Sequence, residues 1–211
     1  MWNKNITGLD VNGTFRSLNG VADENVFIGK ASKAGFFCFF KVWRDMPYDA
    51  VLDYDNILYR VEVKGASGNN SFDLTRGGRS GQQINRDAGS RERRIDRNDC
   101  DFVVCVDSDN GDCYILPVDV LEIINRKSFS KSSLQPFKEK WKLFMHGTNR
   151  LSGGLTRDGL LGCPIEELID IASNVGAEIP HGNYKPPFTR GVKIDNERHK
   201  AILSIWYKLC E

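Results

Sequence analysis

The sequence has little that would suit a disulfide-bonded, zinc-binding or membrane protein. The three histidines are scattered without the spacing of zinc ligands. No stretch approaches the roughly 20 apolar residues that span a bilayer, and the amino-terminal residues lack the basic-then-apolar layout of a signal peptide. We therefore expect no membrane association, an intracellular (cytoplasmic) location and reduced, buried thiols. The six cysteines, which include no Cys-x-x-Cys pair, are Cys38, Cys100, Cys105, Cys113, Cys163 and Cys210.

The net charge of +1 conceals two basic segments in an otherwise acidic chain. Residues 76–97 hold seven arginines against three acids, and residues 126–142 hold six basic residues against Glu139 alone. Phosphate contacts need locally clustered lysine and arginine and do not need a basic protein overall. The pattern therefore indicates a polyanionic partner, with a merely solvated surface as the alternative interpretation.

The amino-terminal region predicts an arm followed by a helix. Residues 1–20 are rich in Asn, Gly and Thr and read as a loop or short arm. Apolar residues then recur at helical spacing over residues 21–34. Asp23 is the candidate cap of this helix, and Gly35 is its candidate end.

Three strands are predicted after this helix. The aromatic run over residues 36–43 is short and bounded by Gly and Pro, which favours a buried strand. Residues 49–54 and 58–64 predict two more strands. Because Asp55 and Asn56 between them are turn-forming residues, we expect these two strands to form a hairpin.

The next segments predict an irregular excursion and a second hairpin. Residues 71–75 are a weaker strand candidate, and residues 76–100 are rich in Gly, Arg and Asp with little periodicity, which suggests a long loop. Residues 101–107 and 113–117 predict the second hairpin, and residues 118–125 a short helix.

The final third changes character. Residues 164–174 and 196–209 predict helices. We therefore divide the chain into a core over residues 1–125, with an arginine-rich loop over residues 76–100, and a mainly helical region over residues 126–211 that serves DNA binding or dimerisation. Four aromatic residues in that region read as core or interface residues: Trp141, Phe144, Trp206 and Tyr207.

The informative chemistry lies in Asp49 and in the run Glu62-Val63-Lys64. On a strand, Glu62 and Lys64 alternate with Val63, so their side chains point to one face, and Asp49 on the preceding strand can come alongside them. Two adjacent carboxylates repel unless a cation lies between them. Mg²⁺ prefers oxygen ligands, here Asp49, Glu62 and the Val63 carbonyl, and Mn²⁺ is expected to substitute for it. A surface ladder of alternating charges is the alternative interpretation.

With these residues in place, the segment resembles the PD-(D/E)XK nuclease superfamily, which includes many restriction endonucleases, archaeal Holliday-junction resolvases and some homing endonucleases. The resemblance runs from about Asp23 to about Leu121 and includes Tyr114-Ile115-Leu116-Pro117, similar to a Tyr-Ile-Pro-like run of the family. It implies an α/β fold with a central mixed β-sheet flanked by helices, the restriction endonuclease-like core, and a helical carboxy-terminal extension. Asp49, Glu62 and Lys64 would be its catalytic residues.

Two further acids enter through the same resemblance. Glu24 lies eleven residues before Gly35, close to the separation in resolvase-like members, which makes Glu24 the candidate for the helix acid at the catalytic centre. A first-turn acid that complements the helix dipole is the alternative interpretation of Glu24. Asp53 is the alternative to Asp49. Two departures are that Tyr48 separates Pro47 from Asp49 and that the run following Lys64 is generic.

The arginine-rich segment offers candidate DNA contacts. Arginine suits phosphate or guanine, glutamine suits adenine edges or sugars, and glycine allows close backbone approach. A mobile solvated loop is the alternative interpretation. The candidates are Arg76, Arg79, Gln82, Gln83, Arg91, Arg93 and Arg94.

Together these features predict a Mg²⁺-dependent endonuclease that hydrolyses phosphodiester bonds of double-stranded DNA. One catalytic set per chain favours a homodimer. Within this class a type II restriction enzyme or a homing endonuclease, from a prokaryote or a phage, leads over a Holliday-junction or other structure-specific nuclease. A non-catalytic nucleic-acid-binding module is the alternative of another class, and a protein-interaction domain is a third.

Overall fold

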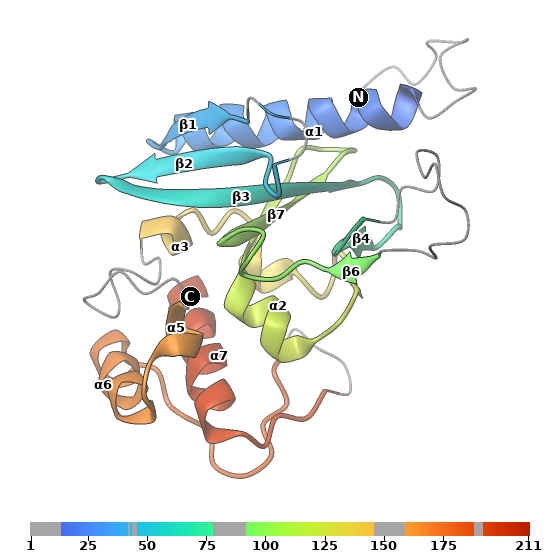
Figure 1. Cartoon of the computed structure of the whole chain (residues 1–211). Coiled ribbons are helices and arrows are strands. Elements are labelled where there is room, and N and C mark those ends of the chain that lie inside the picture. The colour runs from blue at the N-terminus through green and yellow to red at the C-terminus, as the bar shows by residue number, and fades with distance from the viewer. Residues whose placement is uncertain (1–13, 42, 44–45, 78–91, 146–158, 188–191) are drawn as a thin grey trace.

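The structure is a computed structural model, and it describes all residues except 1–13, 42, 44–45, 78–91, 146–158 and 188–191. Its centre is a five-stranded sheet with the strand order β1-β2-β3-β7-β8 (Figure 1). Strand β3 pairs in parallel with β7, whereas the other neighbouring pairs are antiparallel. The predicted mixed α/β sheet is therefore confirmed. Its strands are β1 (Phe37–Phe40), β2 (Ala50–Tyr54), β3 (Ile57–Ala66), β7 (Phe102–Asp107) and β8 (Cys113–Pro117).

Short strand pairs and helices surround this sheet. One small pair joins β4 (Phe72–Asp73) to β9 (Ser128–Phe129), and another joins β5 (Thr75–Arg76) to β6 (Arg93–Arg94). Helix α1 lies alongside β1, β2 and β3, and the carboxy-terminal helices form a separate layer below β7 in the view of Figure 1. The helices are α1 (Thr14–Lys33), α2 (Val118–Ile124), η3 (Gln135–Phe137), α3 (Lys142–Met145), α5 (Gly159–Gly162), α6 (Ile165–Val175) and α7 (Glu197–Cys210).

Local sequence explains the hairpin that carries the candidate catalytic residues. Asp55 and Asn56 have φ angles of 55° and 64°, which is the left-handed conformation that a tight hairpin turn requires at both central positions. The register pairs Tyr54 with Ile57 at the turn and Ala50 with Val61 farther along the strands. The turn and the register together confirm the predicted hairpin.

Helix α1 is longer than predicted. It begins at Thr14, so part of the predicted amino-terminal arm is helical. Asp23 consequently lies inside the helix and is not its cap. The first turn of α1 contains no acidic residue, so Glu24 does not have the first-turn position on which its dipole interpretation depended. Poor helix formers such as Asn19 and Gly20 concealed the periodicity of this helix, and packing against the sheet overrides their weak propensity.

The prediction of a buried strand over residues 36–43 is wrong in its burial. Strand β1 is an edge strand, and only its approach, Phe36, is buried. Phe37 is 75% exposed and Phe39 is 55% exposed. Burial depends on the position of a strand in the sheet, and an edge strand made of aromatic residues has the same sequence pattern as a central one. Central strand β7, by contrast, is buried along its whole length, as its continuous apolar run predicts.

The hydrophobic core continues from the sheet into the carboxy-terminal helices. Phe144 of α3 packs against Tyr59 and Phe102, with ring centroids 6.2 Å and 4.6 Å away, and Trp206 of α7 meets Phe102 edge-on. One buried cluster therefore includes residues from both sides of residue 125. Trp206 and Phe144 are fully buried, and Trp141 and Tyr207 pack on the core, as predicted.

Two sequence-based expectations concern covalent state and membranes. All six cysteines are free, and five of them are buried. The expectation of reduced, buried thiols is therefore confirmed for five, with Cys38 half-buried. Among the described residues, no helix is both long and apolar enough to cross a membrane.

Candidate active site

Asp49, Glu62 and Lys64 meet on one face of the sheet. Asp49 directly precedes β2, and its Oδ2 accepts a hydrogen bond of 2.8 Å from the backbone N–H of Val63 on β3. The ammonium of Lys64 lies 2.7 Å from Oε1 of Glu62. Because Glu62 and Lys64 are two residues apart on a strand, they project from the same face. The structure thus brings together the three residues that the sequence nominated.

The two carboxylates are buried together, which is electrostatically unfavourable. Asp49 is 6% exposed and Glu62 is 7% exposed. Burial raises the pKa of Glu62, the Lys64 ammonium opposes that change, and the negative charge of Asp49 raises the pKa further. The fold therefore keeps like charges close and out of water, an arrangement that favours a bound cation.

Lys41 is a second lysine at the site, and the sequence analysis missed it. Its ammonium forms an ion pair with Oδ1 of Asp49, and its side chain is partly buried. Each acid of the pair therefore has its own lysine, Lys41 for Asp49 and Lys64 for Glu62. The signal was weak, since Lys41 follows an aromatic run and only the pairing of β1 with β2 brings it beside Asp49.

The arginine-rich segment reaches the site through β5 and β6. These strands pair Arg76 with Arg93. The positive charge of Arg76 lowers the pKa of Glu62, although this effect is smaller than the effects of burial, Lys64 and Asp49. Arg94 is exposed and donates a hydrogen bond of 2.6 Å to the carbonyl of Asn125. The other predicted DNA contacts lie outside the described residues: Arg79, Gln82, Gln83 and Arg91.

The residues just after β6 are more ordered than the predicted irregular loop. Buried Asp99 accepts two hydrogen bonds of 2.6 Å from the guanidinium of Arg93, and Arg97 forms an ion pair with Glu122 of α2. Charged side chains thus hold this turn against the core. Asp99 was missed because an acid in an Asp- and Arg-rich stretch carries no local signal of burial.

Helix α1 presents Asp23 to the strand that carries Lys64. Asp23 is buried and accepts a hydrogen bond of 3.0 Å from the hydroxyl of Ser108, and burial raises its pKa. A Cβ at Gly65 would collide with the Asp23 carboxylate, so the glycine after Lys64 permits a close approach of helix and strand. Glu24, the predicted helix acid, is the half-buried neighbour of Asp23 on α1, and its catalytic role stays a prediction.

The donor atoms at the site suit a hard divalent cation. Two carboxylates of like charge lie together beside the Val63 backbone, and oxygen is the ligand type that Mg²⁺ prefers. Such an ion needs only one or two protein carboxylates, because water and phosphate oxygens complete its coordination. Within the described part of the chain, no group of three or more His, Cys, Asp or Glu side chains is placed to hold a metal. The side chains that would hold a metal ion at this site are therefore those of Asp49 and Glu62.

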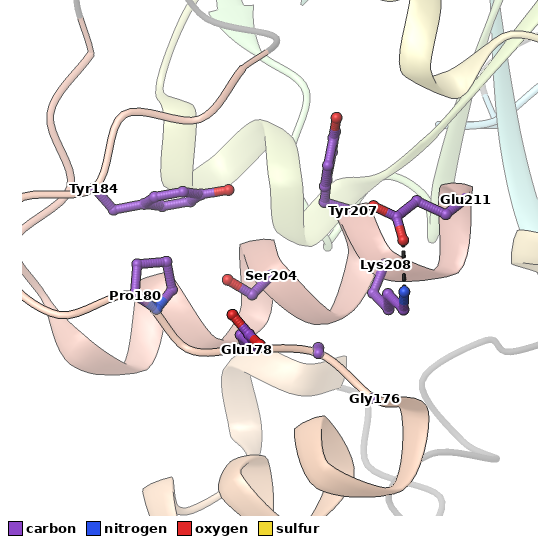
Figure 2. A pocket seen from close by; sticks show the side chains of 9 residues that line it. Gly176, Glu178, Pro180, Tyr184, Ser204, Tyr207, Lys208 and Glu211 are labelled. Carbon is purple, nitrogen blue, oxygen red and sulfur yellow. Dashed lines mark hydrogen bonds and ion pairs between the residues drawn. The ribbon is translucent and has the colours of Figure 1, made fainter.

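A separate pocket lies among the carboxy-terminal helices and does not belong to this site. It has a volume of about 350 Å³ and lies between the chain after α6 and helix α7. Figure 2 shows Tyr184, Ser204 and Glu178 around it, with the ion pair of Lys208 and Glu211 at one end. None of the candidate catalytic residues lines this pocket.

Comparison with protein families agrees with this geometry. The family model described as PD-(D/E)XK endonuclease matches residues 17–136, which is more than half of the chain. The chain therefore belongs to the PD-(D/E)XK endonuclease family. Nucleases of this family generally use divalent metal ions, and membership supports an endonuclease that acts on DNA.

Comparison with solved structures points in the same direction. The chain is similar to the bacterial homing endonuclease I-Ssp6803I, with a TM-score of 0.50 and 25% sequence identity. The similarity covers 62% of this chain and 93% of that chain. No curated protein matches the chain.

Proposed function

We propose that this protein is a Mg²⁺-dependent endonuclease that hydrolyses phosphodiester bonds of double-stranded DNA at specific sequences, as a type II restriction or homing endonuclease does. The observation that carries the proposal is the convergence of Asp49, Glu62 and Lys64 on one face of the sheet. Family membership and the similarity to a homing endonuclease support the same reaction class.

Each residue has a role that follows from its surroundings. Asp49 and Glu62, with the carbonyl of Val63, would hold the ion, which when bound polarises the phosphodiester and activates a water molecule. Lys64 is held at the carboxylate of Glu62, so its ammonium is placed to orient the attacking water and to offset the charge that develops on phosphorus oxygens. Mn²⁺ should substitute for Mg²⁺ because both accept oxygen ligands.

The β5–β6 pair supplies a surface for the DNA backbone. Arg76 and Arg93 are cross-strand partners on one face of this pair, and Arg94, the next residue, points to the other face; Arg93 and Arg94 are exposed. Clustered guanidinium groups bind phosphates and release counterions, so the affinity for DNA should fall steeply as salt is added. The hydrogen bond from Arg76 to the carbonyl of Met46, three residues before Asp49, supports a position of this surface beside the candidate catalytic carboxylates.

We also propose that the protein acts as a homodimer. Cleavage of both strands of a duplex needs two catalytic sets, and one chain supplies one set. The exposed aromatic residues Phe37 and Phe39 on edge strand β1 are an apolar surface that association with a second copy would bury. Sedimentation at micromolar concentration should give the mass of a dimer, and a monomer that converts supercoiled plasmid only to nicked circles would contradict this assignment.

The decisive experiment is incubation of the purified protein with supercoiled plasmid and mixed genomic DNA, in Mg²⁺ or in EDTA. We expect discrete fragments that require the metal and that are missing when Glu62→Ala is used. A smear of products without discrete fragments would show that cleavage is not sequence-specific. Cleavage of branched DNA alone would favour a structure-specific nuclease, and binding without cleavage would favour a non-catalytic module.

Metal binding can be tested apart from cleavage. Asp49→Asn should weaken Mg²⁺ binding in a calorimetric titration, because it removes one of two anionic ligands. Asp53→Asn is the matched control: Asp53 lies on β2, four residues after Asp49, and pairs across the sheet with Phe37 and Leu58. If Asp53→Asn weakens binding and Asp49→Asn does not, the metal site must be moved to Asp53.

A further inference from the structure

Asp99 joins the two arginine-bearing strands β5 and β6. It is only 2% exposed, and it lies in the turn that precedes β7. Its carboxylate chelates the guanidinium of Arg93 and accepts a hydrogen bond of 3.1 Å from the backbone N–H of Asp96. A guanidinium nitrogen of Arg76 lies 3.7 Å from its Oδ1. One buried carboxylate therefore holds two arginines that face each other on β5 and β6.

Arg76 is held from a second direction as well. Its other terminal nitrogen donates a hydrogen bond of 3.2 Å to the carbonyl of Met46. Met46 lies three residues before Asp49. Asp99 lies two residues before Asp101, whose backbone N–H donates a hydrogen bond of 2.8 Å to the carbonyl of Arg60, two residues before Glu62 on β3. Arg76 is thus tied to both chain segments that border the catalytic acids.

The two contacts of Arg76 distinguish it from a surface arginine that only binds the DNA backbone. Arg76 lies between the segment that leads into Asp49 and the turn that precedes β7, the strand paired with β3. Its guanidinium is therefore placed beside the strands that carry the two acids. A guanidinium has five N–H donors and keeps its charge at all relevant pH values, so it can keep its contacts with Met46 and Asp99 while binding a phosphate oxygen.

We propose that Arg76 is a catalytic residue that contacts a non-bridging oxygen of the scissile phosphate, and that Asp99 is the positioning residue that aims it. The inference rests on the proposed nuclease function. Asp99 fixes the guanidinium of Arg76 before substrate arrives, so little reorganisation is needed when negative charge develops on the phosphate. Arg93, whose side chain is exposed, pairs with the same buried carboxylate and is placed to bind a neighbouring phosphate of the DNA backbone.

The test is single-turnover cleavage of a duplex substrate by Arg76→Lys, Asp99→Asn and Asp96→Asn, with DNA affinity measured separately in EDTA. Asp96→Asn is the matched control, since Asp96 contacts Arg93 from the same turn and loses the same charge. Arg76→Lys should lower the cleavage rate constant by about 100-fold while affinity changes much less. Asp99→Asn should lower it by about 10-fold, and Asp96→Asn by less than about twofold.

Two readouts separate positioning from a structural role. In an Arg76→Lys background, Asp99→Asn should have almost no further effect on the rate constant, because residues that act through one contact are not additive. Asp99→Glu should restore part of the rate lost in Asp99→Asn. If Asp99→Asn does not fold, which its thermal unfolding curve would show, Arg76→Lys decides the catalytic assignment and Asp99→Glu the positioning one.

The possible failures are distinguishable. If the wild type cleaves and Arg76→Lys cleaves equally fast, Arg76 is not catalytic while the nuclease function stands. If Asp99→Asn behaves like Asp96→Asn, the positioning role is wrong. If the wild type cleaves no DNA substrate with Mg²⁺ or Mn²⁺, both the proposed function and this inference are overturned.

Discussion

Charged groups are buried both at the candidate catalytic face of the sheet and among the helices around α7, but their neighbours differ. At the candidate catalytic face, buried Asp49 acts on buried Glu62, and each has a lysine at its carboxylate. Around α7, Lys200 is fully buried, donates to the carbonyl of Gly182 and pairs with Glu197, and buried Asp119 accepts from the indole N–H of Trp206. In the second region the negative charge of Glu122 also acts on Asp119, but its effect on the pKa of Asp119 is smaller than those of burial and of Arg97.

This difference shows which property identifies a functional site. Burial raises the pKa of Asp119 to about 6, and it also raises the pKa of Glu62. A raised pKa is therefore common to both regions and does not separate them. The burial of both acids does separate them: Asp49 and Glu62 are each less than 10% exposed, whereas Glu122, which acts on Asp119, is half-buried and pairs with Arg97. A pair of buried acids favours a bound cation even though each acid also has a lysine.

The largest effect should come from the catalytic face. Lys64→Ala should lower the single-turnover cleavage rate by about 1,000-fold, since a charge aimed at the transition state is removed from a buried site. DNA affinity in EDTA should remain within about tenfold of the wild type, as the basic surface of β5 and β6 is unchanged. Retention of the wild-type rate would show that the convergence at this face is structural after all.

The next largest effect should come from Asp119 and should depend on pH. Because the folded-state pKa of about 6 lies above the ordinary value of 3.8, ionised Asp119 destabilises the fold as pH rises between these values. Asp119→Asn keeps an acceptor for Trp206 and removes the charge. It should raise the free energy of unfolding by about 3 kcal/mol above pH 6 and by nothing below pH ~3.5. Urea denaturation across this range checks the slope, and cleavage should be unaltered.

A smaller effect is expected at Lys200. Lys200→Met keeps the apolar stem but leaves the carbonyl of Gly182 without its donor, whereas Glu197 is 64% exposed and stays hydrated. The free energy of unfolding should fall by about 2 kcal/mol. Chemical denaturation measures this loss. Loss of cleavage in the folded variant would contradict a purely structural role for the layer around α7.

The smallest effect should be at the rim of the pocket in Figure 2. Lys208 pairs with Glu211 in solvent, and exposed ion pairs contribute little. Lys208→Ala should leave the thermal unfolding midpoint and the cleavage rate unchanged within error. A clear loss of activity would show that this pocket has a function, which the comparison of the two regions does not predict.

The candidate site was predictable where it depends on short-range pattern. Alternation along β3 places Glu62 and Lys64 on one face, and Asp55 and Asn56 specify the turn that returns the chain past Asp49. Lys41 and Asp99 were not predictable, since their roles depend on strand pairing and on burial. Asp23 was predicted to be a helix cap. Its close approach to β3 was not predicted, because Gly65, which leaves room for the Asp23 carboxylate, looked generic in the sequence.

The division between sequence and tertiary structure follows from the range of the interactions. Period-two alternation, turn-forming residues and continuous apolar runs act within a few residues, so the sequence by itself determined the β2–β3 hairpin, strand β7 and helix α6 with its end at Gly176. Only the tertiary structure decided that β1 is an exposed edge, that Lys41 meets Asp49 and that Asp99 holds Arg76. Those outcomes depend on which strands become neighbours, and burial and charge pairing exist only once distant segments are packed together.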